Sequence, residues 1–263
     1  MHLSSWNMSE DFTRRFDKRA AEYSKYRPSY PPGILTILGS EIRFSPDTIV
    51  ADIGSGTGLL SKLFLQNGNI VHAVEPNDQM RSFAEQDLSS FPRFHSIRGR
   101  AEHTTLRDAS VDLVAVGQAL HWFDPQLSTR EFSRILRSDG SVLIAYNDRN
   151  RGDPVMRDYE AIITKHERDR ASVPDVNDDY ISKFFQDGRR RVFTLPNEQF
   201  LDSEGLSGRL ASASYMPSVV DEKRFEAMKA DVSRLFETWQ ESGRVRLLYD
   251  TVISLRPVRR LPY

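Results

Sequence analysis

The chain has 263 residues, of which 39% are hydrophobic and 28% are charged, as is typical of a globular protein large enough to bury one substantial core. Its 36 basic residues are balanced by 37 acidic residues, so the composition does not favour a polyanionic partner and nucleic acid is not expected. The absence of cysteine excludes disulfides, thiolate catalysis and thiol ligands for metals.

The sequence also carries no recognisable membrane or export signal. No run of about 18 apolar residues occurs, so no membrane span is expected. The segment Met1–Asp11 lacks an apolar stretch and contains acidic residues, so we expect no secretory signal and a cytoplasmic location. The histidines show no spacing typical of metal ligands, and no metal is expected.

The first 44 residues are predicted to form helices. Phe12, Phe16, Ala20 and Tyr23 fall three or four positions apart, which places them on one face of a helix. Prolines within residues 26–32 end that helix, because proline cannot continue it. A second, short helix is predicted for Gly33–Ile42.

From Thr48 onward, short apolar strands alternate with helices. Strands are predicted at 48–53, 69–74, 94–98, 110–117 and 141–146, and helices at 59–66, 78–88 and 127–136. The strands are nearly continuous in apolar residues, so the pattern predicts a parallel sheet covered by helices on both faces.

The last part of the chain is more polar. Helices are predicted at 154–170, 178–186, 206–213 and 224–242, and two strands that complete the sheet at 191–201 and 245–255. No repeat or long linker separates these segments. We therefore expect one domain over 1–263, made of an N-terminal lid (1–44), a core (45–147) and a helical insertion with the last two strands (148–263).

The turn after the first strand is rich in glycine. Gly54, Gly56 and Gly58 alternate, but Leu59 stands where a dinucleotide-binding G-x-G-x-x-G turn needs its third glycine, which weakens a nicotinamide oxidoreductase. Glycines let the backbone approach a ligand, and the following helix offers free N–H groups to a carboxylate. Glu75 ends the next strand, where a carboxylate can accept both hydroxyls of a ribose. Together these features indicate an adenosine ligand with an amino-acid tail.

Six motifs carry a family resemblance in chain order. They are V-A-D-I-G-S-G-T-G, A-V-E-P-N-D-Q-M, A-E, S-V-D-L-V, Q-A-L-H-W-F and R-I-L-R-S-D-G-S-V-L. The chain resembles the class I S-adenosylmethionine-dependent methyltransferases, and within them the type 11 small-molecule branch that includes the ubiquinone/menaquinone and trans-aconitate methyltransferases. The segment Phe16–Pro31 is also similar to this branch. The resemblance implies a doubly wound Rossmann-like α/β sheet of about seven strands with the last strand antiparallel.

The resemblance also implies which residues hold the cofactor S-adenosyl-L-methionine. Asp52 would orient its amino end and Glu75 its ribose, while Met80 would contact the adenine or be a plain core residue. The family's usual Gly-Asp-Ala is replaced around Arg100, which cannot accept a hydrogen bond, so the adenine contact passes to Ala101 and Glu102. The other expected cofactor contacts are Tyr23, Arg27, Gly54, Ser55, Gly56, Thr57, Pro76, Asn77 and Gln118.

The segment after the fourth strand is expected to face the reacting atoms, because open α/β sheets bind ligands at the carboxyl ends of their strands. His121 is a candidate general base. Trp122, Phe123, Tyr146 and Tyr215 are candidates for an enclosed acceptor pocket, although Trp122 could simply pack.

The expected reaction is methyl transfer to a small molecule, at a carboxylate or hydroxyl rather than an amine. A carboxylate would need no base, whereas a hydroxyl would need one. The alternatives are an RNA or protein methyltransferase, which a basic surface or an N-P-P-Y-like segment would favour, and a cofactor-binding protein without activity. A monomer or homodimer is expected.

Overall fold

The computed structural model describes residues 25–167, 176–185, 188–213, 215–217 and 221–256. The helix predicted around Phe12–Tyr23, with the candidate cofactor contact Tyr23, lies outside them. The division into a lid, a core and an insertion within one domain stays a prediction.

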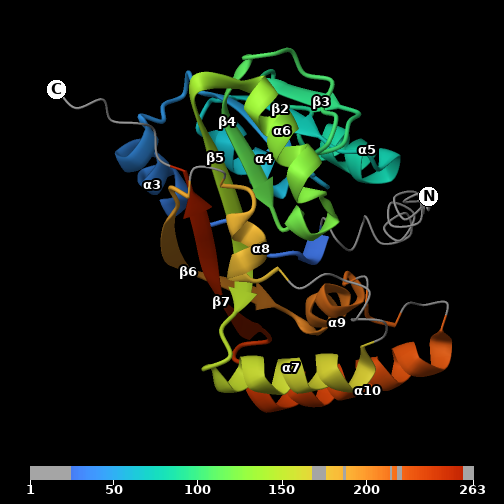
Figure 1. The fold of residues 1–263 in the computed structure, drawn as a ribbon. Coiled ribbons are helices and arrows are strands. Elements are labelled where there is room, and N and C mark those ends of the chain that lie inside the picture. The colour runs from blue at the N-terminus through green and yellow to red at the C-terminus, as the bar shows by residue number, and fades with distance from the viewer. Residues whose placement is uncertain (1–24, 168–175, 186–187, 214, 218–220, 257–263) are drawn as a thin grey trace, which may run out of the picture.

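A seven-stranded sheet in the order β3-β2-β1-β4-β5-β7-β6 organises the chain (Figure 1). Strands β1 to β5 pair in parallel, and β7 is antiparallel to both β5 and β6. This arrangement confirms the predicted Rossmann-like fold with an antiparallel last strand. The strands are β1 (Ile49–Ile53), β2 (Ile70–Val74), β3 (Phe94–Ile97), β4 (Val111–Gly117), β5 (Leu136–Arg149), β6 (Arg191–Leu201) and β7 (Val245–Leu255).

Helices cover both faces of the sheet because apolar residues line both faces. On one face, Leu38, Phe64 and Leu88 pack against the strands from helices α3 and α4 and from the end of α5. On the other face, Phe132 of α6 packs near Phe184, which follows α8. The helices are α3 (Gly33–Ile42), α4 (Leu59–Gln66), α5 (Asp78–Asp87), α6 (Pro125–Ile135) and α8 (Asp178–Ser182).

Three further helices form a cap beyond the carboxyl ends of the parallel strands (Figure 1). The cap consists of α7 (Pro154–His166), α9 (Ser203–Ala211) and α10 (Glu222–Trp239). Its own apolar cluster includes Tyr159, Leu206 and Met228 and reaches Tyr249 on β7. The cap thus packs against the antiparallel strand β7.

The register brings the ends of the central strands to one level. Ile53 at the end of β1 lies beside Val74 at the end of β2, and Gly117 of β4 lies beside Ala145 of β5. The strand order reverses between β1 and β4. Open α/β sheets bind their ligands at such a reversal, outside the carboxyl ends of the strands.

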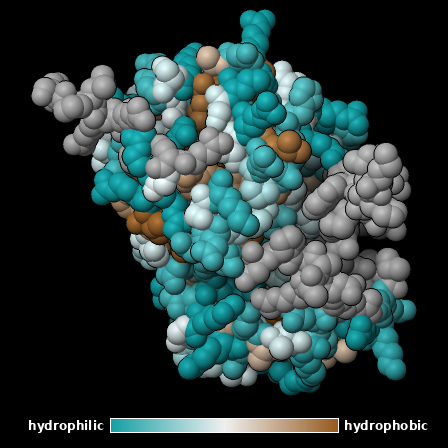
Figure 2. Space-filling view, in the orientation of Figure 1, coloured by the Kyte–Doolittle hydropathy of each residue, from teal (hydrophilic) through white to brown (hydrophobic). Residues whose placement is uncertain are grey.

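The visible face of the surface is mostly hydrophilic, with apolar residues gathered only in small patches (Figure 2). Within the described part of the chain, no helix has both the length and the apolar character needed to cross a membrane.

Candidate active site

The glycine turn after β1 adopts backbone conformations that require glycine. Gly54, Gly56 and Gly58 have φ values of 67°, 56° and 84°, in the left-handed region that side chains with a Cβ disfavour. A Cβ on Gly54 would also lie 2.7 Å from the Cβ of Ala119. The N–H groups of Gly54 and Ser55 donate to the carbonyl of Val74, which ties the turn to the end of β2.

Asp52 lines the cavity beneath this turn and is 1% exposed. Its Oδ2 accepts a hydrogen bond from the Ser61 hydroxyl at 2.6 Å, whereas its buried Oδ1 has no hydrogen-bond partner within the described structure. Burial raises the pKa of Asp52 to about 7, against the opposing hydrogen bonds from Ser61. A cationic ligand group would satisfy the free oxygen and restore the charged carboxylate.

Glu75 lies just beyond β2, and both of its carboxylate oxygens face backbone donors. Gly56 N donates to Oε2 and Asn77 N donates to Oε1, each at 2.9 Å. Burial raises the pKa of Glu75, and these two hydrogen bonds act in the opposite direction. Each carboxylate oxygen can accept more than one hydrogen bond, so Glu75 keeps acceptor capacity for ligand hydroxyls.

Asn77 and Met80 stand next to Glu75 at the start of α5. The Asn77 side chain accepts a hydrogen bond from Met80 N at 2.8 Å and so caps the helix. Met80 is buried. The contacts of Pro76, Asn77 and Met80 with the adenine stay predictions.

Glu102 and Ala101 follow β3. One oxygen of Glu102 accepts hydrogen bonds from Asp124 N at 2.9 Å and from the Ser128 hydroxyl at 3.3 Å, which secures the start of α6. Ala101 is buried. The structure therefore gives Glu102 a local structural role beside its predicted contact with the adenine amino group.

The wall opposite the glycine turn follows β4. Gln118 has a φ of 56°, its N–H donates to the Ala145 carbonyl, and its side-chain amide donates to the Asn147 carbonyl at 3.2 Å. The short 3-10 helix η1 (Leu120–Trp122) comes next, and Leu120 N donates to the Tyr146 hydroxyl at 3.1 Å. Tyr146 thereby fastens η1 to β5.

His121 is half-buried beside Trp122, with the two ring centroids 4.6 Å apart. Burial, together with the charge of Arg27, lowers the pKa of His121 to about 4. The imidazole is therefore neutral and weakly basic at neutral pH. Neither His121 nor Trp122 lines the described cavity, and Phe123 packs edge-on against Phe132.

The segment 25–30 closes the cavity from the side of the cap. The Tyr26 hydroxyl donates to Glu204 of α9 at 2.7 Å, and Arg27 donates to the Ser212 carbonyl at 3.3 Å. Further along, the Asn147 side chain donates to the Ser29 carbonyl at 3.2 Å. Helix α9 and strand β5 thus hold this segment in place.

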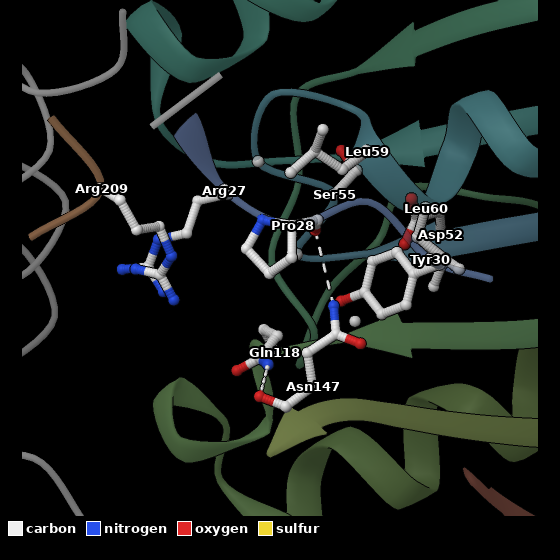
Figure 3. Close-up of a pocket in the computed structure, with 13 residues that line it drawn as sticks. Arg27, Pro28, Tyr30, Asp52, Ser55, Leu59, Leu60, Gln118, Asn147 and Arg209 are labelled. Atoms are coloured by element: carbon white, nitrogen blue, oxygen red, sulfur yellow. Dashed lines mark hydrogen bonds between the residues drawn. The ribbon is translucent and has the colours of Figure 1, made fainter. Parts of the chain in front are cut away.

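One cavity joins the turn, the segment 25–30 and the cap (Figure 3). Of the predicted site residues it gathers Asp52, Gly54, Ser55, Gly56, Gln118 and Arg27. Arg209 of α9, Tyr30 and Asn147 line it too, although the sequence did not single them out as site residues. The full lining is Arg27, Pro28, Tyr30, Asp52, Gly54, Ser55, Gly56, Leu59, Leu60, Gly117, Gln118, Asn147 and Arg209.

Position offers a signal for only some of the missed residues. Asn147 lies on β5 where open α/β sheets bind ligands, and Tyr30 belongs to the Phe16–Pro31 motif. Arg209 carries no such signal, because an arginine in a polar segment is normally exposed. Tyr215 does not line the cavity but lies nearby, with its hydroxyl 3.4 Å from Arg149.

The sheet order, the glycine turn and the acid after β2 together define a Rossmann-like nucleotide-binding protein of the methyltransferase type. Among the described residues, no group of three or more histidine, aspartate and glutamate side chains is arranged to hold a metal.

Comparisons with known proteins extend this assignment. Residues 51–144 match the family model described as a methyltransferase domain. An uncharacterized methyltransferase of Mycobacterium tuberculosis is 33% identical over 169 residues, which cover 63% of this chain and 66% of the relative, slightly under two thirds of its length. A methyltransferase-like protein of Schizosaccharomyces pombe is 24% identical over 91% of this chain and 93% of its own.

The fold is shared with a type II methyltransferase structure from Anaeromyxobacter dehalogenans, with a TM-score of 0.64, 22% identity and coverage of 90% of this chain and 100% of that one. The segment 51–144 therefore carries a methyltransferase domain, and the comparisons together with the fold support a class I S-adenosylmethionine-dependent methyltransferase with S-adenosylmethionine as its cofactor. The narrower resemblance to quinone and aconitate methyltransferases stays a prediction.

The residues of the cavity fit this cofactor, together with Glu75, which does not line the cavity but holds the glycine turn beside it. The unpartnered Asp52 Oδ1 suits an ammonium group, and Glu75 at the end of β2 suits a ribose diol. The glycine turn leads into the N-terminus of α4, where backbone N–H groups favour a carboxylate.

Proposed function

We propose that this chain transfers a methyl group from S-adenosylmethionine to a small-molecule acceptor held between the glycine turn and the cap. The observation that carries the proposal is the single cavity that Asp52 of β1 shares with Arg209 of α9. A cofactor at the turn and an acceptor under the cap would then meet in one enclosed space.

The chemistry requires positioning above all. The bound cofactor supplies a methyl group activated on a sulfonium, and the attacking atom must lie in line behind that methyl group. In the proposed complex, Asp52 and Glu75 fix the amino and ribose ends of the cofactor. The segment 25–30 and α9 exclude water and hold the acceptor opposite Gln118.

The environment of His121 bears on the type of acceptor. A histidine with a pKa near 4 is a poor proton acceptor at neutral pH, because desolvation and the charge of Arg27 both disfavour the imidazolium. An acceptor that is already anionic requires no base. We therefore favour methylation of a carboxylate oxygen over that of a neutral hydroxyl.

The function is tested by incubating the protein with S-adenosylmethionine labelled in the methyl group and a panel of carboxylic acids, phenols and quinols. Label is expected in the organic products of the carboxylic acids. Binding of S-adenosylhomocysteine with no transfer to any of the three classes would instead favour a cofactor-binding protein without this activity. Absence of S-adenosylhomocysteine binding would contradict the site itself.

A further inference from the structure

Arg209 is a buried arginine on the inner side of helix α9. Arg209 is 5% exposed, and the Nε of its guanidinium has no hydrogen-bond partner within the described structure. No carboxylate of the described residues lies within ion-pair distance of it, whereas nearby Arg149 pairs with Glu160. A guanidinium cannot lose its proton in a protein, so this buried positive charge persists.

Tyrosines, rather than acids, surround this guanidinium: its charge interacts with Tyr249, Tyr159 and Tyr215, and Tyr249 also forms a side-chain hydrogen bond with it. The ring of Tyr249 lies 6.0 Å from its central carbon, within the range of a cation–π contact. Burying an ion in such surroundings is unfavourable unless a partner of opposite charge is supplied. The described chain supplies no such partner at Arg209.

The neighbouring charges increase the demand for an anion. Arg27 and Arg209 line the same cavity, and Figure 3 shows both guanidinium groups extending toward one region of it. Burial raises the pKa of the Tyr215 hydroxyl, but the charges of Arg149, Arg27 and Arg209 outweigh that effect and lower it. The end of the cavity under the cap is therefore electropositive.

We propose that Arg209 binds a carboxylate group of the methyl acceptor and so selects anionic acceptors. This inference rests on the proposed function. Helix α9 belongs to the cap rather than to the cofactor-binding strands, and its inner side is fixed where Tyr26 packs directly on Gly208. Arg209 is thereby presented to the cavity from the side opposite Asp52.

The reaction balances without a proton transfer. An acceptor carboxylate oxygen forms the new bond to the methyl carbon while the carbon–sulfur bond breaks, and the electron pair of that bond stays on sulfur. The acceptor becomes a neutral ester, and the cofactor becomes S-adenosylhomocysteine. No base is needed, in agreement with the weakly basic His121.

A carboxylate at Arg209 could come from the acceptor or from the amino-acid tail of the cofactor, and calorimetry separates the two. S-adenosylhomocysteine and 5′-methylthioadenosine, which lacks the tail, are titrated into the wild type, Arg209→Gln and the exposed control Arg246→Gln. The proposal requires that Arg209→Gln change neither affinity by more than about twofold. A loss of at least tenfold for S-adenosylhomocysteine alone would assign Arg209 to the cofactor and overturn the proposal.

The second arm measures acceptor-like probes on the protein loaded with S-adenosylhomocysteine. Benzoate, cinnamate, hexanoate and succinate are compared with their carboxamides. In the wild type at least one carboxylate should bind tenfold or more tightly than its amide, and Arg209→Gln should abolish that preference while Arg246→Gln retains it. No preference in the wild type, or a preference that survives in Arg209→Gln, would overturn the proposal.

The two arms are independent of turnover, so they separate this inference from the proposed function. A carboxylate preference without methyl transfer would support the anion site at Arg209 and refute the proposed reaction. Methyl transfer to neutral acceptors alone would support the reaction and refute the anion site. Arg209→Met, which also removes the charge and keeps much of the side-chain length, serves if Arg209→Gln fails to fold. A ligand-binding arginine left without its anion should also destabilise the free protein, so folded Arg209→Gln should melt no lower than the wild type, and a lower melting temperature would indicate a structural arginine.

Discussion

Replacing Asp52 by asparagine should stabilise the free protein at high pH while weakening cofactor binding. Burial raises the native pKa of Asp52 from an ordinary value of 3.8 to about 7. The folded protein therefore retains a proton that the unfolded chain releases between pH 4 and 7, and folding loses stability as pH rises through that window. Each pKa unit is worth about 1.4 kcal/mol, so the full effect reaches an upper bound of about 4 kcal/mol above pH 8.

Urea unfolding of the wild type and Asp52→Asn from pH 5 to pH 9 measures this effect. With a slope of about 3 kcal/mol per molar urea, the midpoint of the variant should exceed that of the wild type by up to roughly 1 M at pH 9 and by less than half of that at pH 5. Asp87→Asn removes the same charge at an exposed position and serves as the control. If the difference in urea midpoint between Asp52→Asn and the wild type stays constant from pH 5 to pH 9, the raised pKa of Asp52 is refuted.

The same variant tests the role of the carboxylate in binding. A charge-assisted hydrogen bond to an ammonium contributes about 1.5–3 kcal/mol, so S-adenosylhomocysteine should bind Asp52→Asn about 10- to 100-fold more weakly. In the wild type its affinity should rise with pH up to about 7, because the ionised Asp52 is the form that binds. Equal affinities at pH 8 would remove Asp52 from the cofactor site.

Three further predictions concern the walls of the site. Glu75→Ala should weaken S-adenosylhomocysteine binding by about 10- to 100-fold in calorimetry, and Glu75→Gln by less, because the amide keeps one acceptor oxygen. His121→Asn should leave kcat for a carboxylate acceptor within about threefold and its pH profile unchanged, whereas a loss beyond about 100-fold would identify a general base. Asn147→Ala should destabilise the fold by about 1–3 kcal/mol in urea unfolding, because its side chain bonds the Ser29 carbonyl and the Thr251 hydroxyl; an unchanged midpoint would mean that these bonds contribute nothing.

The sequence was sufficient for the elements whose pattern is local. Helix α4 and strands β6 and β7 have the predicted limits, because apolar periodicity and flanking turn residues define them. Strand β5 is longer than the predicted 141–146. It begins at Leu136, directly after α6, and its polar end, Asn147–Arg149, continues only because β7 pairs with it.

The site residues likewise divide into those that a local sequence pattern predicts and those that depend on contacts between distant segments. Asp52 and Glu75 were predictable because Asp52 lies near the end of an apolar strand and Glu75 directly follows the next one, and the parallel register brings those strand ends together. Arg209 was not predictable, because its place in the cavity depends on α9 meeting the segment 25–30, which lies about 180 residues earlier. Such a contact leaves no periodic signal in either segment, and an arginine gives no indication of burial by itself.

The two walls of the cavity differ in charge, and this difference gives the proposed reaction a direction. Asp52 presents an unpartnered carboxylate oxygen at the turn, and Arg209 presents a guanidinium under the cap. A cation is therefore favoured at one wall and an anion at the other, and the low dielectric of the enclosed cavity strengthens both preferences. Methyl transfer removes the sulfonium charge and converts the acceptor carboxylate to a neutral ester. The proposed ester thus loses the attraction to Arg209 that held the acceptor, whereas the ammonium group at Asp52 is unchanged, so the charge at the cap wall favours release of the methylated product.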